Sequence, residues 1–279
     1  MKKISRRSFL AAAGLSVAAL ALTACGGSSA NTASSVASSA ASSEAASTSA
    51  AAGELATVEA GKLTMATNAT FPPYEMTTDA GDIEGIDVET AQAIADKLGL
   101  ELQIDDMDFD AALLSVQQGK ADIVMAGVTV TDERKAVMDF SDSYATGIQS
   151  IIVPEGSDIA SPDDLAGKKI GTQRGTTGYI YCSDDFGDDA VVAYDNGLTA
   201  VQALNNGQVD AVVIDNAPAK EYVAANPGLA ILDTSYAEED YAIGMAKGSS
   251  LEAAVNAALE ELKADGTLQA IVDKYITAE

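Results

Sequence analysis

The chain has 279 residues, with 42 acidic and 16 basic side chains, no histidine, no tryptophan and a formal net charge of −26. So acidic a chain is unsuited to binding nucleic acid or anionic membrane surfaces, which attract basic proteins. The lack of histidine excludes a histidine-based catalytic triad and a His/Cys zinc site, so we expect no enzyme activity, no metal and no cofactor.

Residues 1–24 have the features of a signal peptide. Four cations and no acid precede an apolar run, 9–22, that is too short and too rich in alanine for a membrane span. The run ends in Leu22-Thr23-Ala24-Cys25, which resembles a bacterial lipobox with Cys25 as the lipidated residue. The alternative is an ordinary signal peptide with an incidental cysteine. The pair Arg6-Arg7 also resembles a twin-arginine signal, so the export route, Sec or twin-arginine, stays open.

Residues 25–54 are expected to form a linker, because they are almost entirely Ser, Ala, Gly and Thr. A flexible linker of this length spans about 30 Å. Removal of the signal peptide would change the net charge from −26 to −30 and leave Cys182 as the only cysteine beyond the lipid site. We therefore expect no intramolecular disulfide and interpret Cys182 as a small buried residue.

From residue 55 onward, helix and strand patterns alternate, which predicts an α/β fold. Asp87 and Asp110 are expected to cap two helices that end at Gly99 and Gly119. A Ser-Pro-Asp-Asp sequence at Ser161 predicts another helix start. The remaining predictions are strands at 63–66, 100–104, 122–125 (within a buried stretch, 121–131) and 169–172, and helices near 251–265 and 268–275.

Residues 111–124 and 199–212 share one pattern: a short helix, a glycine stop and an Asp-led buried strand. The modest interpretation is that all βαβ units look alike. The stronger one is that the chain has two lobes of similar topology. The end of the second strand would then place Gly127 and Thr129, with Arg134 beyond them, in one lobe and Asp215 in the other.

Arg134 and Arg174 are the only arginines after the signal peptide. The planar fork of arginine grips a carboxylate bidentately, which lysine does not do. Arg134 follows a buried strand, and α/β sheets bind ligands at such strand ends. The alternative is a surface arginine paired with Asp132 or Glu133.

The segment 171–178, G-T-Q-R-G-T-T-G, reads as a strand running into a Gly-rich helix start, where free N–H groups favour an anion. It lacks the lysine and the spacing of a P-loop, so it does not indicate a nucleotide. An amino acid zwitterion fits better. Arg134 and backbone N–H groups would take its carboxylate, and Asp215 its ammonium.

These segments resemble the polar amino acid solute-binding proteins of ABC importers, the group of the glutamine-, histidine- and lysine/arginine/ornithine-binding proteins. The likeness runs from about Gly61 to the C-terminus and is carried by A-T-N-A-T-F-P-P-Y-E (66–75), G-I-D-V (85–88), G-K-A-D (119–122), the stretches 126–143 and 210–215, and A-D-G-T (264–267). The resemblance implies a two-lobed periplasmic-binding-protein-like clamp of type II. Its two crossover strands would lie near 148–153 and 233–245. Lobe 1 would then comprise 55–147 plus 241–279, and lobe 2 would comprise 148–240.

The resemblance also assigns the pocket. Arg134 matches the residue for the α-carboxylate and Asp215 the residue for the α-ammonium. Gly127 and Thr129 would offer backbone and hydroxyl contacts, and Thr177 its N–H. Phe71 and Phe109 match the walls around the ligand side chain, although Phe109 could also be a plain core residue.

The chain departs from the family at the side-chain end of the pocket. Asn68 stands where relatives carry an acid, Gln173 where the glutamine-binding type has a lysine, and Ile214 where it has a histidine. A pocket of neutral amides favours a neutral polar ligand such as glutamine over arginine or lysine. Two alternatives stay open: Asp106 or Asp108 could turn inward to serve a cation, or a one-residue slip could bring Arg174 inward and favour an acidic ligand.

We therefore predict a monomeric receptor, lipid-anchored on the outer face of the bacterial cell membrane. It would capture a free polar L-amino acid and deliver it to an ABC permease, and it would contact the membrane through the anchor only. The alternatives are a receptor for a cationic amino acid or cystine, a sensor subunit, or an enzyme on the same fold, since cyclic dehydratases resemble these proteins.

Overall fold

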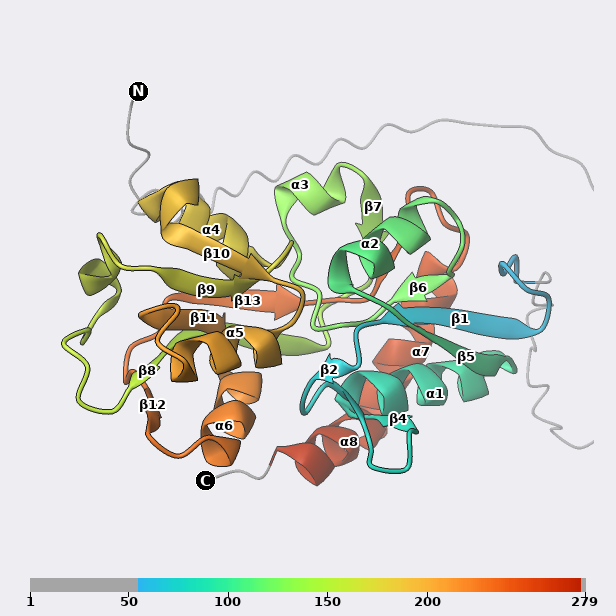
Figure 1. Ribbon diagram of the computed structural model, residues 1–279. Helices are drawn as coiled ribbons and strands as arrows, with labels where there is room; N and C mark the ends of the chain where they lie inside the picture. The colour runs from blue at the N-terminus through green and yellow to red at the C-terminus, as the bar shows by residue number, and fades with distance from the viewer. Residues whose placement is uncertain (1–54, 277–279) are drawn as a thin grey trace, which may run out of the picture. The chain divides into compact units, whose positions relative to one another are not determined.

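The computed structural model describes residues 55–276, which belong to one compact unit (Figure 1). The predicted signal peptide, the predicted lipid site at Cys25 and the predicted linker lie outside the described residues. No helix among residues 55–276 has the length and apolarity that crossing a bilayer requires.

The first sheet has five strands in the order β5-β1-β6-β14-β7, and we call the part built on it lobe 1. β1 pairs in parallel with β5 and β6, whereas β14 pairs antiparallel with β6 and β7. A small antiparallel sheet, β2-β3-β4, adjoins it. The elements of lobe 1 are β1 (Lys62–Thr67), β2 (Thr70–Phe71), β3 (Glu75–Thr77), β4 (Ile83–Glu84), α1 (Ile86–Leu98), β5 (Glu101–Asp106), α2 (Phe109–Gln117), β6 (Ile123–Val124), α3 (Asp132–Lys135), β7 (Met138–Phe140), β14 (Gly244–Ala246), α7 (Glu252–Ala264) and α8 (Thr267–Tyr275).

The second sheet runs β10-β9-β11-β8-β12, with β13 also paired to β8, and we call the part built on it lobe 2. β9 is parallel to β10 and β11, and β8 is antiparallel to its partners. Its elements are β8 (Ala145–Pro154), η1 (Pro162–Leu165), β9 (Ile170–Gln173), α4 (Thr177–Phe186), η2 (Asp188–Ala190), β10 (Val191–Tyr194), α5 (Gly197–Asn205), β11 (Ala211–Asp215), α6 (Asn216–Ala225), β12 (Leu229–Ile231) and β13 (Ala237–Tyr241).

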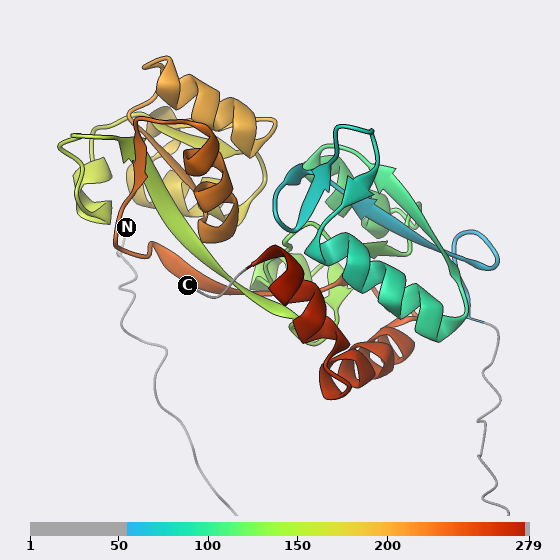
Figure 2. The same cartoon turned by 90° about the horizontal axis from the view of Figure 1, so that it is seen from below.

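The chain enters lobe 2 along β8 and returns along β13. The two strands run side by side in antiparallel register, from Ala145 opposite Tyr241 to Gln149 opposite Ala237 (Figure 2). This arrangement confirms the predicted α/β clamp with two crossover strands. The helix faces that the sequence indicated are buried: Ile94 of α1, for example, has no exposed surface and belongs to the same core cluster as Val255 and Leu259 of α7.

The strand expected at 122–125 forms at Ile123–Val124, and the chain then runs into a loop in which Gly127 has φ of 55°. The two predicted helix caps were wrong. Neither Asp87 nor Asp110 caps its helix, since α1 and α2 begin one residue earlier, after Gly85 and Asp108. Gly85 fits where a side chain would not, because a Cβ there would lie 2.1 Å from the carbonyl oxygen of Tyr74. Asp87 is thereby drawn into the interior, where it is fully buried.

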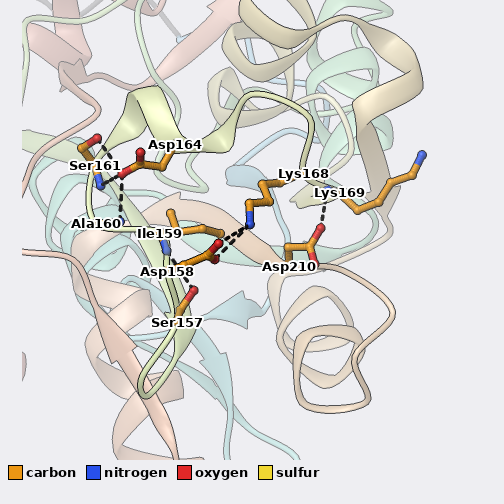
Figure 3. A network of polar contacts seen from close by, with 9 residues as sticks. All are labelled: Ser157, Asp158, Ile159, Ala160, Ser161, Asp164, Lys168, Lys169 and Asp210. Carbon is orange, nitrogen blue, oxygen red and sulfur yellow. Dashed lines mark hydrogen bonds and ion pairs between the residues drawn. The ribbon is translucent and has the colours of Figure 1, made fainter.

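The connection between β8 and β9 is held by its own polar contacts (Figure 3). Asp164 accepts hydrogen bonds from the backbone N–H groups of Ala160 and Ser161, as expected for the predicted helix start, here a 3-10 turn. Lys168 pairs with Asp158 at 2.9 Å. None of these side chains lines the cavity described below, so their charges stabilise the loop rather than a ligand.

Candidate functional site

All nine residues predicted to contact the ligand line one cavity between the two lobes. The cavity also has three residues that were not predicted as site residues, Glu75, Ala126 and Thr176. Both lobes supply its wall: Asn68, Phe71, Glu75, Phe109, Ala126, Gly127, Thr129 and Arg134 come from lobe 1, and Gln173, Thr176, Thr177 and Asp215 from lobe 2.

Arg134 is held in place by the backbone. Thr131 caps the short helix α3 by accepting the N–H of Arg134 at 3.1 Å. The guanidinium donates to the carbonyl oxygens of Thr129 at 2.8 Å and Gly175 at 3.1 Å, so it contacts both lobes. It also lies 5.4 Å from the ring centroid of Phe109. Arg134 is only 8% exposed, so the alternative of a surface arginine paired with Asp132 or Glu133 is wrong.

No carboxylate within 4 Å neutralises Arg134 in the part of the chain that the structure describes. Burial lowers the pKa of its guanidinium, and the charge of Glu239 is the strongest influence in the opposite direction. A guanidinium has five N–H donors, and two carbonyl oxygens do not use them all. The arrangement therefore favours an anion with two oxygens in the cavity.

Asp215 is the last residue of β11 and only 6% exposed. The hydroxyl of Tyr241 donates to one of its oxygens, and Nε2 of Gln149 donates to the other at 2.7 Å. Burial raises the pKa of Asp215 to about 7, while these hydrogen bonds act against the increase. When a cationic group enters the cavity, the buried carboxyl group of Asp215 gains a partner of opposite charge.

Glu239, on the crossover strand β13, connects the residues around it. One of its oxygens accepts hydrogen bonds from the hydroxyls of Thr129 at 3.1 Å and Thr177 at 2.9 Å, and from Gln149 at 3.0 Å. Thr129 belongs to lobe 1, Thr177 is the first residue of α4 in lobe 2, and Gln149 lies on the other crossover strand. Neither Glu239 nor Gln149 was predicted from the sequence. Glu239 stands two residues before Tyr241 and so shares its strand face, and this spacing is the signal that could have found Glu239.

Asn68 and Gln173 meet across the two lobes, since Nε2 of Gln173 donates to Oδ1 of Asn68 at 2.9 Å. Nδ2 of Asn68 donates to the carbonyl oxygen of Met107, also at 2.9 Å. Phe109 is 5% exposed, belongs to a core cluster and also lines the cavity.

Gly127 lies against the ring of Phe71, where a Cβ would come within 2.9 Å of a ring carbon. The φ of 55° at Gly127 also favours glycine. Only glycine therefore lets the chain turn this close to the aromatic wall.

The cavity wall also holds a carboxyl group that was not predicted from the sequence. Glu75, the first residue of β3, is fully buried and lines the cavity. Asp106 and Asp108 do not turn inward, because both are exposed. Arg174 is also exposed and lies 3.7 Å from Asp195, so the one-residue slip did not occur. Among residues 55–276 there is no group of three or more acidic or cysteine side chains that could hold a metal ion.

Comparison with known proteins adds family evidence to this geometry. The model of the bacterial extracellular solute-binding proteins, family 3, matches residues 63–278. A probable histidine-binding protein of Neisseria gonorrhoeae is 34% identical over 96% of this chain and 95% of its own length. The ABC transporter glutamine-binding protein GlnH of Bacillus subtilis is 34% identical over 71% of this chain and 74% of its own. The crystal structure of an ancestral arginine-binding protein bound to glutamine has a TM-score of 0.75 and 42% identity, and covers 79% of this chain and 100% of that one.

Proposed function

The chain belongs to family 3 of the bacterial extracellular solute-binding proteins, and on that premise we propose that it captures a polar L-amino acid outside the cell and delivers it to an ABC permease. In this proposal the cavity is the binding site, and Arg134 and Asp215 hold the α-carboxylate and the α-ammonium. The ligand leaves unchanged, because the receptor performs no chemistry on it.

The single observation that carries the proposal is the buried guanidinium of Arg134, which lines the cavity without a carboxylate counter-ion within 4 Å among the described residues. A buried charge of this kind is costly unless a partner compensates it. The α-carboxylate of an amino acid supplies the missing oxygens, and Asp215 in the same wall suits the α-ammonium. A micromolar affinity corresponds to about −8 kcal/mol, of which two charge-assisted hydrogen bonds at roughly 1.5–3 kcal/mol each supply much.

The side chain of the ligand meets Asn68, Gln173, Glu75 and the rings of Phe71 and Phe109 in this proposal. The amides favour a neutral polar side chain of about the size of glutamine. Glu75 supports a second candidate, a cationic amino acid, because a buried carboxyl group is a partner for an ammonium or a guanidinium. The neutral amide side chain and the cationic side chain both end in N–H groups. The amide oxygens and the carboxyl group in the cavity wall are acceptors for hydrogen bonds from these N–H groups.

Closure of the two lobes on the ligand would follow a population shift, in which contacts from both lobes stabilise the closed arrangement. The hydrogen bonds of Arg134 to Gly175, of Gln173 to Asn68 and of Tyr222 to Thr70 at 2.5 Å are examples of such contacts. We propose the boundaries of lobe 1 as 55–147 plus 241–279 and those of lobe 2 as 148–240, with β8 and β13 as the hinge.

The anchor is a separate part of the proposal and rests on Leu22-Thr23-Ala24-Cys25 and the polar segment that follows. Two acyl chains retain a protein on a membrane, whereas one chain anchors only marginally. We expect the Cys25→Ala variant to appear in the medium and the wild-type protein in the membrane fraction. A variant that remains in the membrane fraction at the wild-type level contradicts the lipid anchor.

A thermal-shift screen tests the function directly. The unlipidated Cys25→Ala protein is heated with each of the twenty amino acids, cystine and ornithine. We expect one or a few polar amino acids to raise the melting temperature, because a ligand that binds only the folded state stabilises it. Calorimetry then gives the affinity, and recovery of the unchanged ligand separates a receptor from an enzyme. If none of these ligands shifts the melting temperature, the proposed function is wrong.

A further inference from the structure

Glu239 lies behind the cavity wall, on the crossover strand β13, and is only 7% exposed. It is not one of the residues that line the cavity. One of its carboxylate oxygens, Oε2, accepts hydrogen bonds from the hydroxyls of Thr129 at 3.1 Å and Thr177 at 2.9 Å. Both threonines line the cavity, one from each lobe. Glu239 therefore acts on the cavity through side chains that a ligand would touch.

The side chain of Gln149 fixes Glu239 in the role of acceptor. Nε2 of Gln149 donates to Oε2 of Glu239 at 3.0 Å and to Oδ2 of Asp215 at 2.7 Å. The amide oxygen of Gln149 in the same place would face two carboxyl groups, so the place belongs to the nitrogen, whose two hydrogens serve the two acids. Three donors thus converge on Oε2 of Glu239. The other oxygen, Oε1, has no hydrogen-bond partner among the described residues.

These contacts occupy the hydroxyl hydrogens of both threonines. A hydroxyl has one hydrogen and two lone pairs, and each threonine donates its hydrogen to Glu239. The hydroxyl oxygens of Thr129 and Thr177 lie 3.4 Å apart, and no hydrogen is left to fill the contact between them. Each hydroxyl oxygen therefore offers a ligand only lone pairs, which accept hydrogen bonds from an N–H group and repel a carboxylate.

The two ends of an amino acid zwitterion meet different groups as a result. The carbonyl oxygen of Thr129 holds the guanidinium of Arg134 at 2.8 Å, on the side proposed for the carboxylate. Gln149 links Glu239 to Asp215, the acid proposed for the ammonium. An ammonium has three N–H donors, and one carboxyl group does not use them all. Hydroxyl oxygens without a free hydrogen are suitable further acceptors.

We propose that Glu239 is a positioning residue that turns the hydroxyls of Thr129 and Thr177 into acceptors for the α-ammonium of the ligand. Glu239 acts without touching the ligand. It accepts both hydroxyl hydrogens and so keeps them out of the cavity, where they would point at a positively charged group. This role rests on the proposed function, because the ammonium is that of the captured amino acid.

The test is calorimetric titration of the full chain, unlipidated through Cys25→Ala. The probes are the amino acid that raises the melting temperature most in the thermal-shift screen and its two analogues that each lack one end of the zwitterion. For glutamine these are glutaramic acid, without the ammonium, and 4-aminobutanamide, without the carboxylate. For arginine they are 5-guanidinopentanoic acid and agmatine. We define the ammonium preference as the affinity for the amino acid divided by that for the analogue without the ammonium, and the carboxylate preference in the same way.

Glu239→Met removes the acceptor while the side chain keeps nearly the same length. We expect the ammonium preference to fall at least about tenfold, as the loss of a hydrogen bond to a charged group requires, and the carboxylate preference to stay within about threefold of the wild type. Glu239→Gln keeps one oxygen for the three donors and places its nitrogen at the position of Oε1. Its ammonium preference should therefore stay within about threefold of the wild type. A purely structural role would weaken the binding of all three compounds alike.

Glu238→Met is the matched control, because Glu238 lies on the same strand and is exposed, and it should behave as the wild type. Thr129→Val removes one hydroxyl but keeps the carbonyl that holds Arg134. It should lower the ammonium preference at least about tenfold, and it tests the role of Glu239 even if Glu239→Met does not fold.

The role of Glu239 is overturned by a wild-type ammonium preference in Glu239→Met or in Thr129→Val. It is also overturned if Glu239→Gln loses as much of this preference as Glu239→Met, or if the wild-type protein binds an amino acid without any ammonium preference. A wild-type protein that no amino acid in the screen stabilises overturns the proposed function itself.

Discussion

The cavity wall holds two buried groups of opposite charge type, Arg134 and Glu75, and their surroundings differ. Arg134 is fixed by two backbone carbonyls and has no carboxylate partner within 4 Å among the described residues. Neither oxygen of Glu75 accepts a hydrogen bond from the described residues. A group fixed by the backbone presents the same geometry to every ligand. A buried group without a partner has no such fixed geometry.

The largest expected effect is at the fixed group. Arg134→Lys should weaken binding of every amino acid ligand by about 3 kcal/mol, more than 100-fold, because a lysine ammonium cannot form the bidentate pair. The melting temperature of the ligand-free protein should change little. Calorimetry with glutamine and arginine measures the loss, and Arg174→Lys, at an exposed position, is the control. Unchanged affinity of Arg134→Lys for both ligands rules out Arg134 as the carboxylate clamp.

The buried acids should set the pH dependence of stability. The pKa of Asp87 is about 6 and that of Asp215 about 7 in the folded protein, both above the ordinary value of about 4. The folded state thus binds more protons than the unfolded state between about pH 4 and pH 7, so the free energy of unfolding decreases as pH rises through this window. We expect the ligand-free protein to melt at a higher temperature at pH 5 than at pH 8.

Asp87→Asn sharpens this prediction. It removes one of the titrating groups and should reduce the pH dependence by on the order of 2 kcal/mol. Scanning calorimetry at several pH values measures the effect in both proteins. A melting temperature that increases steadily from pH 5 to pH 8 in the wild-type protein contradicts the placement of these acids.

A smaller effect is expected where the two lobes touch near Arg134. Gly175 of lobe 2 has φ of 76°, and a Cβ there would lie 1.7 Å from an oxygen of Asp110 in lobe 1. Gly175→Ala should therefore weaken ligand binding less than tenfold, because the Asp110 side chain can move and the remaining backbone strain is about 1 kcal/mol. The double variant with Asp110→Ala should recover part of the affinity. A loss of ligand affinity above 100-fold in the Gly175→Ala variant would contradict this prediction.

Nine of the twelve residues that line the cavity were predicted from the sequence, and Glu75 was not. Gly127, Thr129 and Arg134 lie on the segment that follows the buried strand β6, and Asp215 ends the buried strand β11, so the local pattern was enough to bring them together. Glu75 is a single acid beside Tyr74, and nothing within its own segment shows that it is buried. Asp87, 12 residues further along, is buried as well, because it lies inside α1 instead of capping it.

Contacts between residues far apart in the sequence could not be predicted from local sequence patterns either. The hydrogen bond between Asn68 and Gln173 joins residues 105 positions apart, and that between Thr129 and Glu239 joins residues 110 positions apart. Alternation within β13 indicates that Glu239 points inward, but not which side chains it meets. Periodicity predicts a face of an element, whereas the partner on the other side depends on how the elements pack.

The most direct measurement compares glutamine with two analogues that each lack one end of the zwitterion, 4-aminobutanamide without the carboxylate and glutaramic acid without the ammonium. Calorimetric titration of the unlipidated protein at pH 7 gives the three affinities. If Arg134 and Asp215 hold the two ends, glutamine binds and each analogue loses at least about 100-fold in affinity. An analogue without the carboxylate that binds as tightly as glutamine would contradict the account.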